Sequence, residues 1–150
     1  MCYPWSLANT WQSLNGNIKS SIITGLAVHG STILAATQDF LSGVVSFDGG
    51  KTWSQGDSGG EAGLVLFNPG NPLYAYAFNV GGFFYSKDGG KTFTPATGLP
   101  GSLGIGDLAV DTKNPSTVYV ASTSQGIFIS GNRGVSFSPA PSPLGLPVRL

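Results

Sequence analysis

Residues 46–53 are Ser-Phe-Asp-Gly-Gly-Lys-Thr-Trp, and nearly the same octapeptide, Ser-Lys-Asp-Gly-Gly-Lys-Thr-Phe, follows at residues 86–93. An altered third copy, Ser-Gly-Asn-Arg-Gly-Val-Ser-Phe, occupies residues 130–137. The closing aromatic residues recur about every forty positions, at Trp11, Trp53, Phe93 and Phe137. Such a period is typical of repeated supersecondary units that bury their faces against one another.

The composition indicates a folded, turn-rich protein. Its 150 residues are enough for one domain with a core. Apolar residues make up 41% of the chain beside 23 Gly and 10 Pro, which excludes a polar linker. Only 9% of residues are charged, seven acidic and seven basic, so no basic stripe is present to bind nucleic-acid phosphates.

The sequence lacks the residues that several kinds of site and segment require. Cys2 has no second cysteine to pair with and no Cys/His set for zinc, so we expect no disulfide, metal or cofactor. No stretch of 18 apolar residues predicts a membrane span. The first residues lack the basic and apolar regions of a secretory signal peptide.

Each period contains four short segments rich in β-branched and aromatic residues, separated by Gly, Pro and Asn turns, which predicts an antiparallel meander. The expected strands are residues 22–28, 32–37, 43–46 and 51–54, then 63–67, 73–78, 82–86 and 92–94, then 105–110, 117–122, 126–130 and 135–138. Segments such as 64–67 are apolar on both faces and need cover on both sides. Stacked meanders give that cover, so we predict an all-β segment of a β-propeller. A twelve-stranded β-sandwich fits the strand lengths but not the period.

We expect a single repeat domain over residues 1–150. It divides into the end of a preceding blade (1–16), blade one (17–56), blade two (57–97), blade three (98–138) and an outgoing segment (139–150). Propellers close with four to eight blades, so three blades need further blades of a parent chain or a second copy. The open ends would expose apolar faces near residues 22–28, 32–37 and 118–122, and we expect the isolated chain to associate.

The octapeptide resembles the Asp-box, or BNR repeat, Ser-x-Asp-x-Gly-x-Thr-Trp. Residues 46–53 match fully, residues 86–93 differ only in Phe93, and the third copy has Asn132 and Ser136 in place of Asp and Thr. Residues 108–119 also resemble a strand–turn–strand segment of such propellers. Relatives include sialidases, xyloglucanase-type glycoside hydrolases, sortilin-type receptors and photosystem II assembly-factor propellers, which share a fold and no single activity. The resemblance implies a secreted or periplasmic location.

We expect the repeated octapeptide to have a structural role. Aspartates can accept hydrogen bonds from turn amides, glycines relieve the cost of a positive φ, and large aromatic side chains fill space between blades. The resemblance also places Asp-boxes on the outer rim, away from the ligand-binding face. The residues of this frame are Ser46, Asp48, Gly50, Thr52, Trp53, Ser86, Asp88, Gly90, Thr92, Phe93, Ser130, Asn132, Gly134, Ser136 and Phe137.

The candidate functional face lies opposite these turns, where a propeller gathers the loops between second and third strands and the blade-to-blade connections. These segments are residues 37–43, 79–82 and 123–126, with connections 54–63 and 94–106. The weak catalytic candidates there are Asp39, Asp57 and Glu61, with Gln38 and Ser58 near them. The resemblance places Asp39 roughly where xyloglucanase-type enzymes carry a catalytic Asp, with Asn79 and Gln125 at the corresponding positions.

Glycoside hydrolysis requires two carboxylates across the scissile bond, which Asp39 with Asp57 or Glu61 would supply. Solvated loop acids are the alternative interpretation, and we favour it. A sialidase would require three arginines, whereas the chain has only Arg133 and Arg149. We expect His29 to be a hairpin-turn residue rather than a catalytic base.

The second repeat is rich in aromatic residues, which suit either a glycan-stacking platform or an inter-blade core, and we favour the core. They are Tyr74, Tyr76, Phe78, Phe83, Phe84 and Tyr85. The sequence therefore favours a non-catalytic propeller module, a binding or scaffold element of a larger protein with a glycan or protein ligand. The alternative is a fragment of a glycoside hydrolase.

Overall fold

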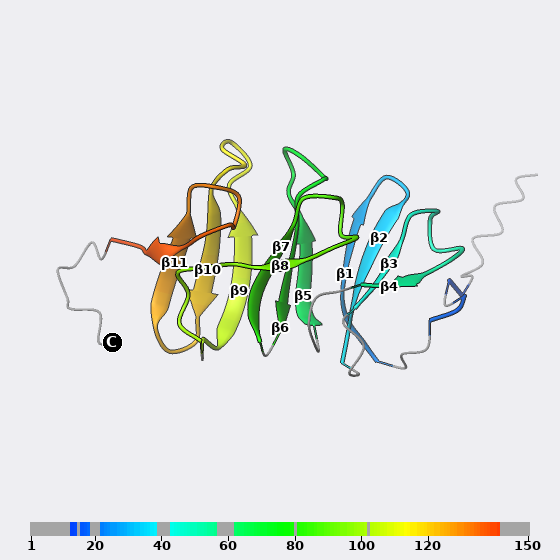
Figure 1. The fold of residues 1–150 in the computed structure, drawn as a ribbon, viewed down its shortest axis with the longest axis horizontal. Helices are drawn as coiled ribbons and strands as arrows, with labels where there is room; N and C mark the ends of the chain where they lie inside the picture. The colour runs from blue at the N-terminus through cyan, green and yellow to red at the C-terminus, as the bar shows by residue number, and fades with distance from the viewer. Residues whose placement is uncertain are drawn as a thin grey trace, which may run out of the picture.

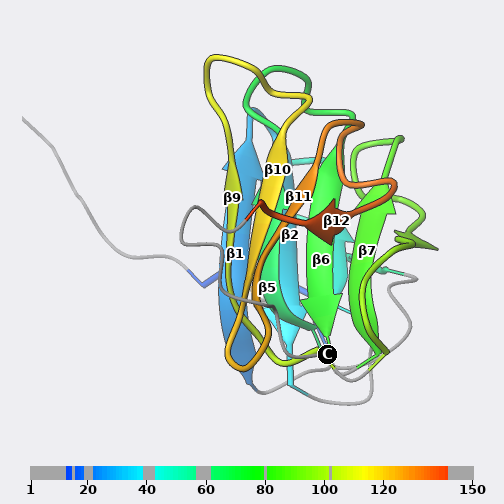
Figure 2. The same ribbon diagram turned by 90° about the vertical axis from the view of Figure 1, so that its left-hand side faces the viewer.

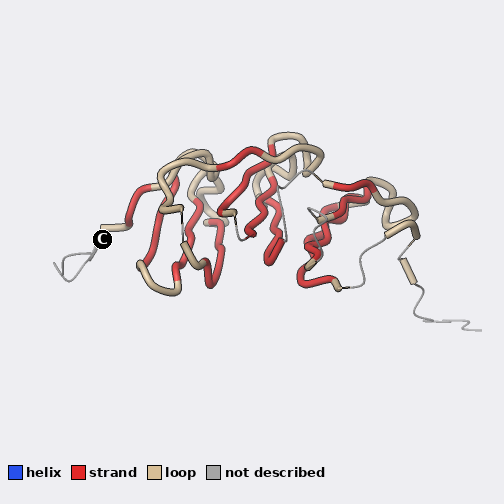
Figure 3. The backbone as a smooth tube through the Cα atoms, turned by 60° about the horizontal axis from the view of Figure 1, so that its bottom comes forward, coloured by secondary structure: helices blue, strands red, loops and turns tan. Residues whose placement is uncertain are grey.

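A computed structural model describes residues 13–14, 16–18, 22–38, 43–56, 62–79, 81–101 and 103–141. These residues form three four-stranded sheets and no helix (Figures 1 and 3). We call the sheets blades 1, 2 and 3. Blade 1 consists of β1 (Ile23–His29), β2 (Thr32–Thr37), β3 (Val44–Ser46) and β4 (Ser54–Gln55). Blade 2 consists of β5 (Ala62–Phe67), β6 (Ala75–Asn79), β7 (Gly82–Ser86) and β8 (Thr94–Pro95), and blade 3 of β9 (Ile105–Val110), β10 (Val118–Ser122), β11 (Gly126–Ser130) and β12 (Ser138–Pro139).

Within each blade, consecutive strands pair antiparallel in chain order. The blades stand in a row, and the view along that row shows their faces one behind another (Figures 1 and 2). This confirms the predicted all-β architecture of stacked meanders. The blade boundaries in the connecting segments stay a prediction.

The fourth strand of each blade begins later than the sequence predicts. Residues 51–54 were the expected segment in blade 1, whereas β4 begins at Ser54, and β8 and β12 begin at Thr94 and Ser138. The cause is the preceding turn, where the Thr52 amide donates to the Asp48 carboxylate at 2.9 Å instead of to a neighbouring strand. The hairpin turn of blade 1 is also shorter than expected, because His29 ends β1 and pairs with Thr32.

Strand register explains why the apolar strands are apolar on both faces. In β5, Leu66 packs toward blade 3, while Val65 and Phe67 pack toward blade 1. Blade 2 is thus covered on both sides, as residues 64–67 predict.

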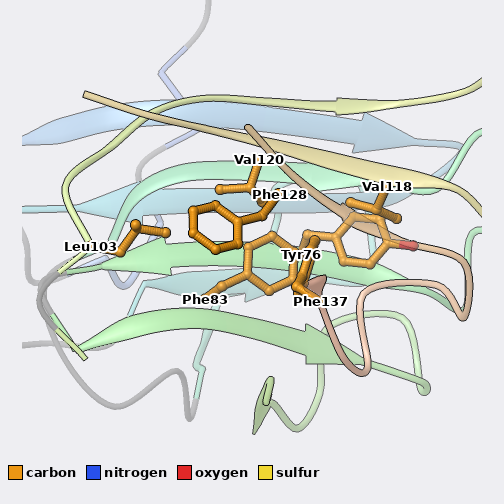
Figure 4. Close-up of a cluster of buried hydrophobic side chains, with 7 residues drawn as sticks. All are labelled: Tyr76, Phe83, Leu103, Val118, Val120, Phe128 and Phe137. Atoms are coloured by element: carbon orange, nitrogen blue, oxygen red, sulfur yellow. The ribbon is translucent and has the colours of Figure 1, made fainter. Parts of the chain in front are cut away.

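The larger core lies between blades 2 and 3 (Figure 4). Tyr76 and Phe83 have ring centroids 5.7 Å apart, and Phe83 meets the edge of Phe137 at 4.9 Å. Edge-on aromatic pairs of this kind contribute about 0.5–1.5 kcal/mol beyond the area they bury. The buried members of this cluster are Tyr76, Phe83, Leu103, Val118, Val120, Phe128 and Phe137.

The core between blades 1 and 2 is built from smaller side chains. Its buried members are Ala27, Leu34, Val45, Phe67 and Ala75, with Val65 and Phe93 packed against them. Trp53 packs on the opposite face of blade 1, against Ile18 and Ile33. The sequence therefore predicted the burial of Trp53 but not that the chain segment before β1 covers it.

A buried asparagine ties blade 2 to blade 3. Asn68 Nδ2 donates to Tyr76 Oη at 2.8 Å and to the Pro115 carbonyl at 2.6 Å. Its Oδ1 accepts from the Gly70 and Asn71 amides. Because the polar atoms are paired, Asn68 is buried without the cost of an unsatisfied group.

Candidate functional site

The octapeptide turns and the β1–β2, β5–β6 and β9–β10 turns lie at one end of the blades, which we call the turn end. Backbone hydrogen bonds join them, from Gly49 N to Ser31 O and from Gly89 N to Leu73 O at 2.8 Å, and from Arg133 N to Ser116 O at 2.9 Å. The same pairing recurs in all three blades, so the turn end is a repeated structural element.

The opposite end, the loop end, carries the segments that follow β2, β6 and β10. The Gln38 amide donates to Ile22 O at 3.1 Å, and the Thr123 amide donates to Gly104 O at 2.8 Å. These bonds join the loops to the connections that lead into β1 and β9. The described residues that follow β2, β6 and β10 thus lie at the end opposite the octapeptide turns, and the assignment of this end as the functional face stays a prediction.

Uncharged polar groups hold the loop end in shape. Ser122 Oγ accepts from the Ser124 and Gln125 amides at 3.2 and 3.0 Å. Asn79 Oδ1 accepts from the Gly81 amide at 2.7 Å, and Thr123 Oγ1 donates to Gly104 O. Among the described residues of this end, the exposed side chains Gln38, Thr123 and Ser124 are polar and uncharged.

The catalytic candidates Asp39, Asp57 and Glu61, together with Ser58, lie outside the described residues. Register corrects one assignment of this region. Thr37, Asn79 and Ser122 pair with the first residues of β1, β5 and β9, so Asn79 is equivalent to Thr37 and not to Asp39. The predicted correspondence of Asn79 with Asp39 is therefore wrong, because it ignores this register.

The first octapeptide turn is closed by the Asp48 carboxylate. Its Oδ1 accepts from the Thr52 amide at 2.9 Å and from Ser46 Oγ at 2.8 Å, and its Oδ2 accepts from Thr52 Oγ1 at 2.6 Å. Ser46 Oγ also accepts from the Gly50 amide at 2.8 Å. The carboxylate lone pairs are thus engaged inside the turn.

The second turn repeats this arrangement and adds one donor. The Thr92 amide, Thr92 Oγ1 and Ser86 Oγ donate to Asp88 at 2.7–2.9 Å, and the Lys91 amide donates at 3.0 Å. The Gly90 amide donates to Ser86 Oγ at 2.9 Å.

The third turn keeps the geometry with an amide in place of the carboxylate. Asn132 Oδ1 accepts from the Ser136 amide at 3.0 Å and from Ser130 Oγ at 2.8 Å. Asn132 Nδ2 donates to Ser136 Oγ at 2.8 Å, so the direction of the side-chain hydrogen bond is reversed relative to Thr52 and Asp48. The turn therefore accepts either side chain, provided that the hydroxyl rotates.

The hydrogen bonds within the first two turns also lower the pKa values of Asp48 and Asp88. The Thr52 hydroxyl, followed by the Thr52 amide and the Ser46 hydroxyl, lowers the pKa of Asp48 to about 2. Partial burial raises the pKa of Asp88, but the bonds from Thr92, Ser86 and Lys91 outweigh burial and leave that pKa lowered. Both carboxylates are ionised at neutral pH.

This shift predicts an acid-sensitive stability. Because the folded-state pKa of Asp48 lies below the unfolded value of about 3.9, the stabilisation is complete above that value and is lost as the pH falls toward about 2. We expect the double variant Asp48→Asn, Asp88→Asn to lose less stability than the parent chain between pH 5 and about 2.5. Urea midpoints across this range measure the difference.

The third turn supplies the matched control. Asn132→Asp installs a carboxylate in the same hydrogen-bond frame, so it should make the acid dependence steeper than in the parent chain. Equal pH dependence for all three proteins would contradict a stabilising role for these carboxylates.

A glycine in the second and in the third octapeptide turn contacts the neighbouring blade. A Cβ at Gly90 would collide with the Leu34 side chain of blade 1, and one at Gly134 would lie 3.0 Å from Tyr76 Cε1 of blade 2. Both glycines have positive φ, 92° and 78°. The second and third turns therefore each receive a side chain of the preceding blade against a glycine.

Two other predicted residues lie away from the loop end. Arg133 has φ 60° in the third turn, and its guanidinium lies over the Tyr74 ring at 5.2 Å. The His29 ring packs beside Phe67, with centroids 6.1 Å apart. Arg133 and His29 therefore each pack against an aromatic ring of blade 2 and not against the loop end.

The described residues contain no group of three or more His, Cys, Asp or Glu side chains that could hold a metal ion. Within the same part of the chain, no helix is long and apolar enough to cross a membrane.

Comparison with known proteins places the fold. No protein-family model matches the chain. A xyloglucanase of Paenibacillus sp. is 31% identical over 125 residues, a match that covers 79% of this chain and 12% of that protein. The chain thus spans a small part of this curated relative.

Solved structures agree on the architecture. An ancestral GH74 enzyme superposes with a TM-score of 0.71 at 21% identity over 85% of this chain and 19% of that chain. The GH74 xyloglucanase of Xanthomonas campestris gives a TM-score of 0.60 at 17% identity, covering 84% of this chain and 24% of that one. The designed protein Ika4 gives 0.65 at 16% identity, and the match covers 89% of this chain and 81% of Ika4. The chain has the fold of a partial β-propeller and is similar in sequence to a segment of a xyloglucanase.

Proposed function

We propose that this chain is a non-catalytic β-propeller module that acts as a binding element of a larger protein, with a neutral glucan chain as the ligand of its loop end. The observation that carries the proposal is the set of uncharged polar side chains at the loop end, where Gln38, Thr123 and Ser124 are exposed and Gln125 is half-buried. Neutral sugars are bound by hydrogen bonds to such groups rather than by ion pairs.

The similarity to a xyloglucanase segment supports a xyloglucan-type ligand. The Ser122 hydroxyl accepts the backbone amide of Gln125, which fixes the loop and leaves the Gln125 side-chain amide to make contacts of its own. Gln38 and Ser124 are exposed at the same end. These side chains are the contacts that we assign to the ligand.

The octapeptide turns are, in this proposal, Asp-boxes with a structural role. Their carboxylates are engaged by Ser, Thr and backbone donors of the same turn, at the end opposite the loop end. This arrangement supports bracing of the turn rather than ligand binding.

A glycoside hydrolase fragment is the second candidate, and the similarity to a xyloglucanase favours it. Its chemistry would need a general acid and a second carboxylate on the two sides of the scissile bond. Asp39 with Asp57 or Glu61 are the residues that we assign to these roles in that case.

Titration of the chain with xyloglucan oligosaccharides tests the leading proposal. We expect saturable binding by calorimetry without release of reducing sugar. Gln125→Ala keeps the backbone hydrogen bond to Ser122 and should weaken binding about fivefold, the effect of one lost hydrogen bond of about 1 kcal/mol. Lys113→Ala, at the turn end, is the control and should bind as the parent chain does.

Product release separates the two candidates. Reducing sugar formed above background, and abolished by Asp39→Asn or Asp57→Asn, would establish the hydrolase and refute the non-catalytic module. Absence of both binding and hydrolysis would reject the glucan ligand.

A further inference from the structure

The two outward faces of the row of blades are apolar. On blade 1, Leu26 and Val28 are 64% and 62% exposed. On blade 3, Ile127 is 54% and Tyr119 is 37% exposed, and they line a hollow of about 190 Å³. Exposed apolar patches of this kind mark interaction surfaces.

Strand register shows which buried residues of the inner interfaces are equivalent to these exposed residues. Ile33, Ala75 and Val118 pair with Ser46, Ser86 and Ser130, and so occupy equivalent positions in β2, β6 and β10. Tyr119 is then the equivalent of Tyr76, which blade 3 buries completely. By the same count, Ile127 is the equivalent of Phe83, which is 3% exposed.

The exposed residues of blade 1 are equivalent to residues of blade 2 that pack against blade 1. Val28 pairs with Ile33 as Phe67 pairs with Ala75, so Val28 is the equivalent of Phe67, which is 8% exposed against blade 1. Leu26 is the equivalent of Val65, which packs in the same interface. The outward faces of blades 1 and 3 are therefore the two halves of the contact that the chain makes twice within itself.

We propose that a second copy of this chain docks head to tail, the outward face of blade 3 in each copy packing on the outward face of blade 1 in the other. Two different complementary patches on one molecule give a ring when the rotation closes. Two copies supply six blades, within the range of four to eight in which propellers close.

Asn17, in the segment before β1, replaces an incoming connection and not a sheet face. The Trp53 amide donates to Asn17 Oδ1 at 2.8 Å, as the Phe137 amide donates to Thr97 O at 2.9 Å. Asn17 thus holds on blade 1 the place that Thr97 holds on blade 3, the place of an incoming connection. The docking copy needs to supply only its sheet face.

Leu14 marks where that sheet face arrives. Its side chain lies 3.1 Å from the Cβ position of Gly50, where the equivalent glycine, Gly90, receives Leu34 of the preceding blade. Leu34 is the equivalent of Tyr119. In the docked pair, Tyr119 takes this place and Leu14, half exposed in the single copy, moves aside.

One charged residue sets the edge of the contact. Asp107 lines the hollow beside Ala109, on β9, the edge strand of blade 3. Because an unpaired buried carboxylate is costly, the docked face must leave Asp107 at its solvated border. The contact is therefore centred on Tyr119 and Ile127.

Sedimentation velocity of the 150-residue chain at micromolar concentrations tests the proposal. We expect a single species of twice the 15.4 kDa mass of one chain. Ile127→Asp and Leu26→Asp should each give monomer, with unchanged circular dichroism because both side chains are exposed. Leu73→Asp is the matched control: Leu73 is equally exposed but lies in the β5–β6 turn at the turn end, so the dimer should persist.

Mixing the two monomeric variants identifies the geometry. Ile127→Asp retains the blade 1 face and Leu26→Asp retains the blade 3 face, so the mixture should form a weaker heterodimer through the one intact contact. A symmetric face-to-face dimer would not show this rescue and would overturn the proposal. A monomeric parent chain, open-ended growth with concentration, or dissociation by Leu73→Asp would overturn it equally.

Discussion

Replacing Gly98 by alanine should destabilise the protein by about 2–5 kcal/mol, which is a large share of the stability of a small domain. Gly98 has φ 79°, and a Cβ there would collide with the carbonyl oxygen of Phe137. The colliding atom belongs to the backbone and cannot rotate away. The hydrogen bonds from Phe137 N to Thr97 O and from Thr97 N to Val135 O, at 2.9 and 3.1 Å, hold the two segments together.

Two other glycines distinguish the effect of backbone strain at positive φ from the effect of a colliding Cβ atom. Gly49 has φ 74° with nothing within 4 Å of a Cβ, so Gly49→Ala should cost about 1 kcal/mol from backbone strain alone. Gly101 also has open space around its Cβ position and is not among the glycines of positive φ, so Gly101→Ala should change little. Urea denaturation followed by circular dichroism measures all three. An effect of Gly98→Ala no larger than that of Gly49→Ala would contradict the collision.

Truncating Tyr76 to alanine should cost about 3–5 kcal/mol, the range for removing a large aromatic side chain from a core. Tyr76 is fully buried and packs on Phe83 (Figure 4). Its Cε1 atom also lies 3.0 Å from the Cβ position of Gly134. Burial raises the pKa of its hydroxyl, which remains neutral and accepts a hydrogen bond from Asn68.

Two further variants show which part of Tyr76 causes the loss of stability in Tyr76→Ala. Tyr76→Phe removes only the hydroxyl, and because Asn68 Nδ2 keeps its bond to Pro115 O, the cost should be about 1 kcal/mol. Tyr119→Ala changes the equivalent residue on the outward face of blade 3 and should cost well under 1 kcal/mol when measured below the concentration at which copies associate. If Tyr76→Ala were as mild as Tyr119→Ala, the interface of blades 2 and 3 would not be the main core.

The sequence predicted the repeat and most strands because period and strand propensity are local signals. The strands β2, β7, β9 and β11 have the predicted bounds. The late starts of β4, β8 and β12 were missed because a side chain, Asp48 in blade 1, takes the amide that propensity assigns to a strand. Propensity counts residue types and not the donors that a carboxylate captures.

The candidate site was predicted less well. The position of the loop end followed from the topology, but matching Asn79 to Thr37 rather than to Asp39 required the register of β5 with β6, which loop lengths conceal. The contact of Leu14 with Gly50 was also beyond prediction, since it joins segments thirty-six residues apart without a repeated motif. The chemistry of Asp39, Asp57 and Glu61 stays a prediction.

The glycine contacts between blades bear on how such a chain lengthens or shortens. Blade 2 carries both a glycine that receives the preceding blade, as Gly90 receives Leu34, and a side chain in its second strand that the next blade receives, as Gly134 receives Tyr76. A duplicated repeat therefore brings both partners of its contact with it and disturbs no residue already in place. Because each blade touches only its neighbours, the number of repeats is free to change by whole units during gene duplication, while the residues inside a unit remain bound to one another.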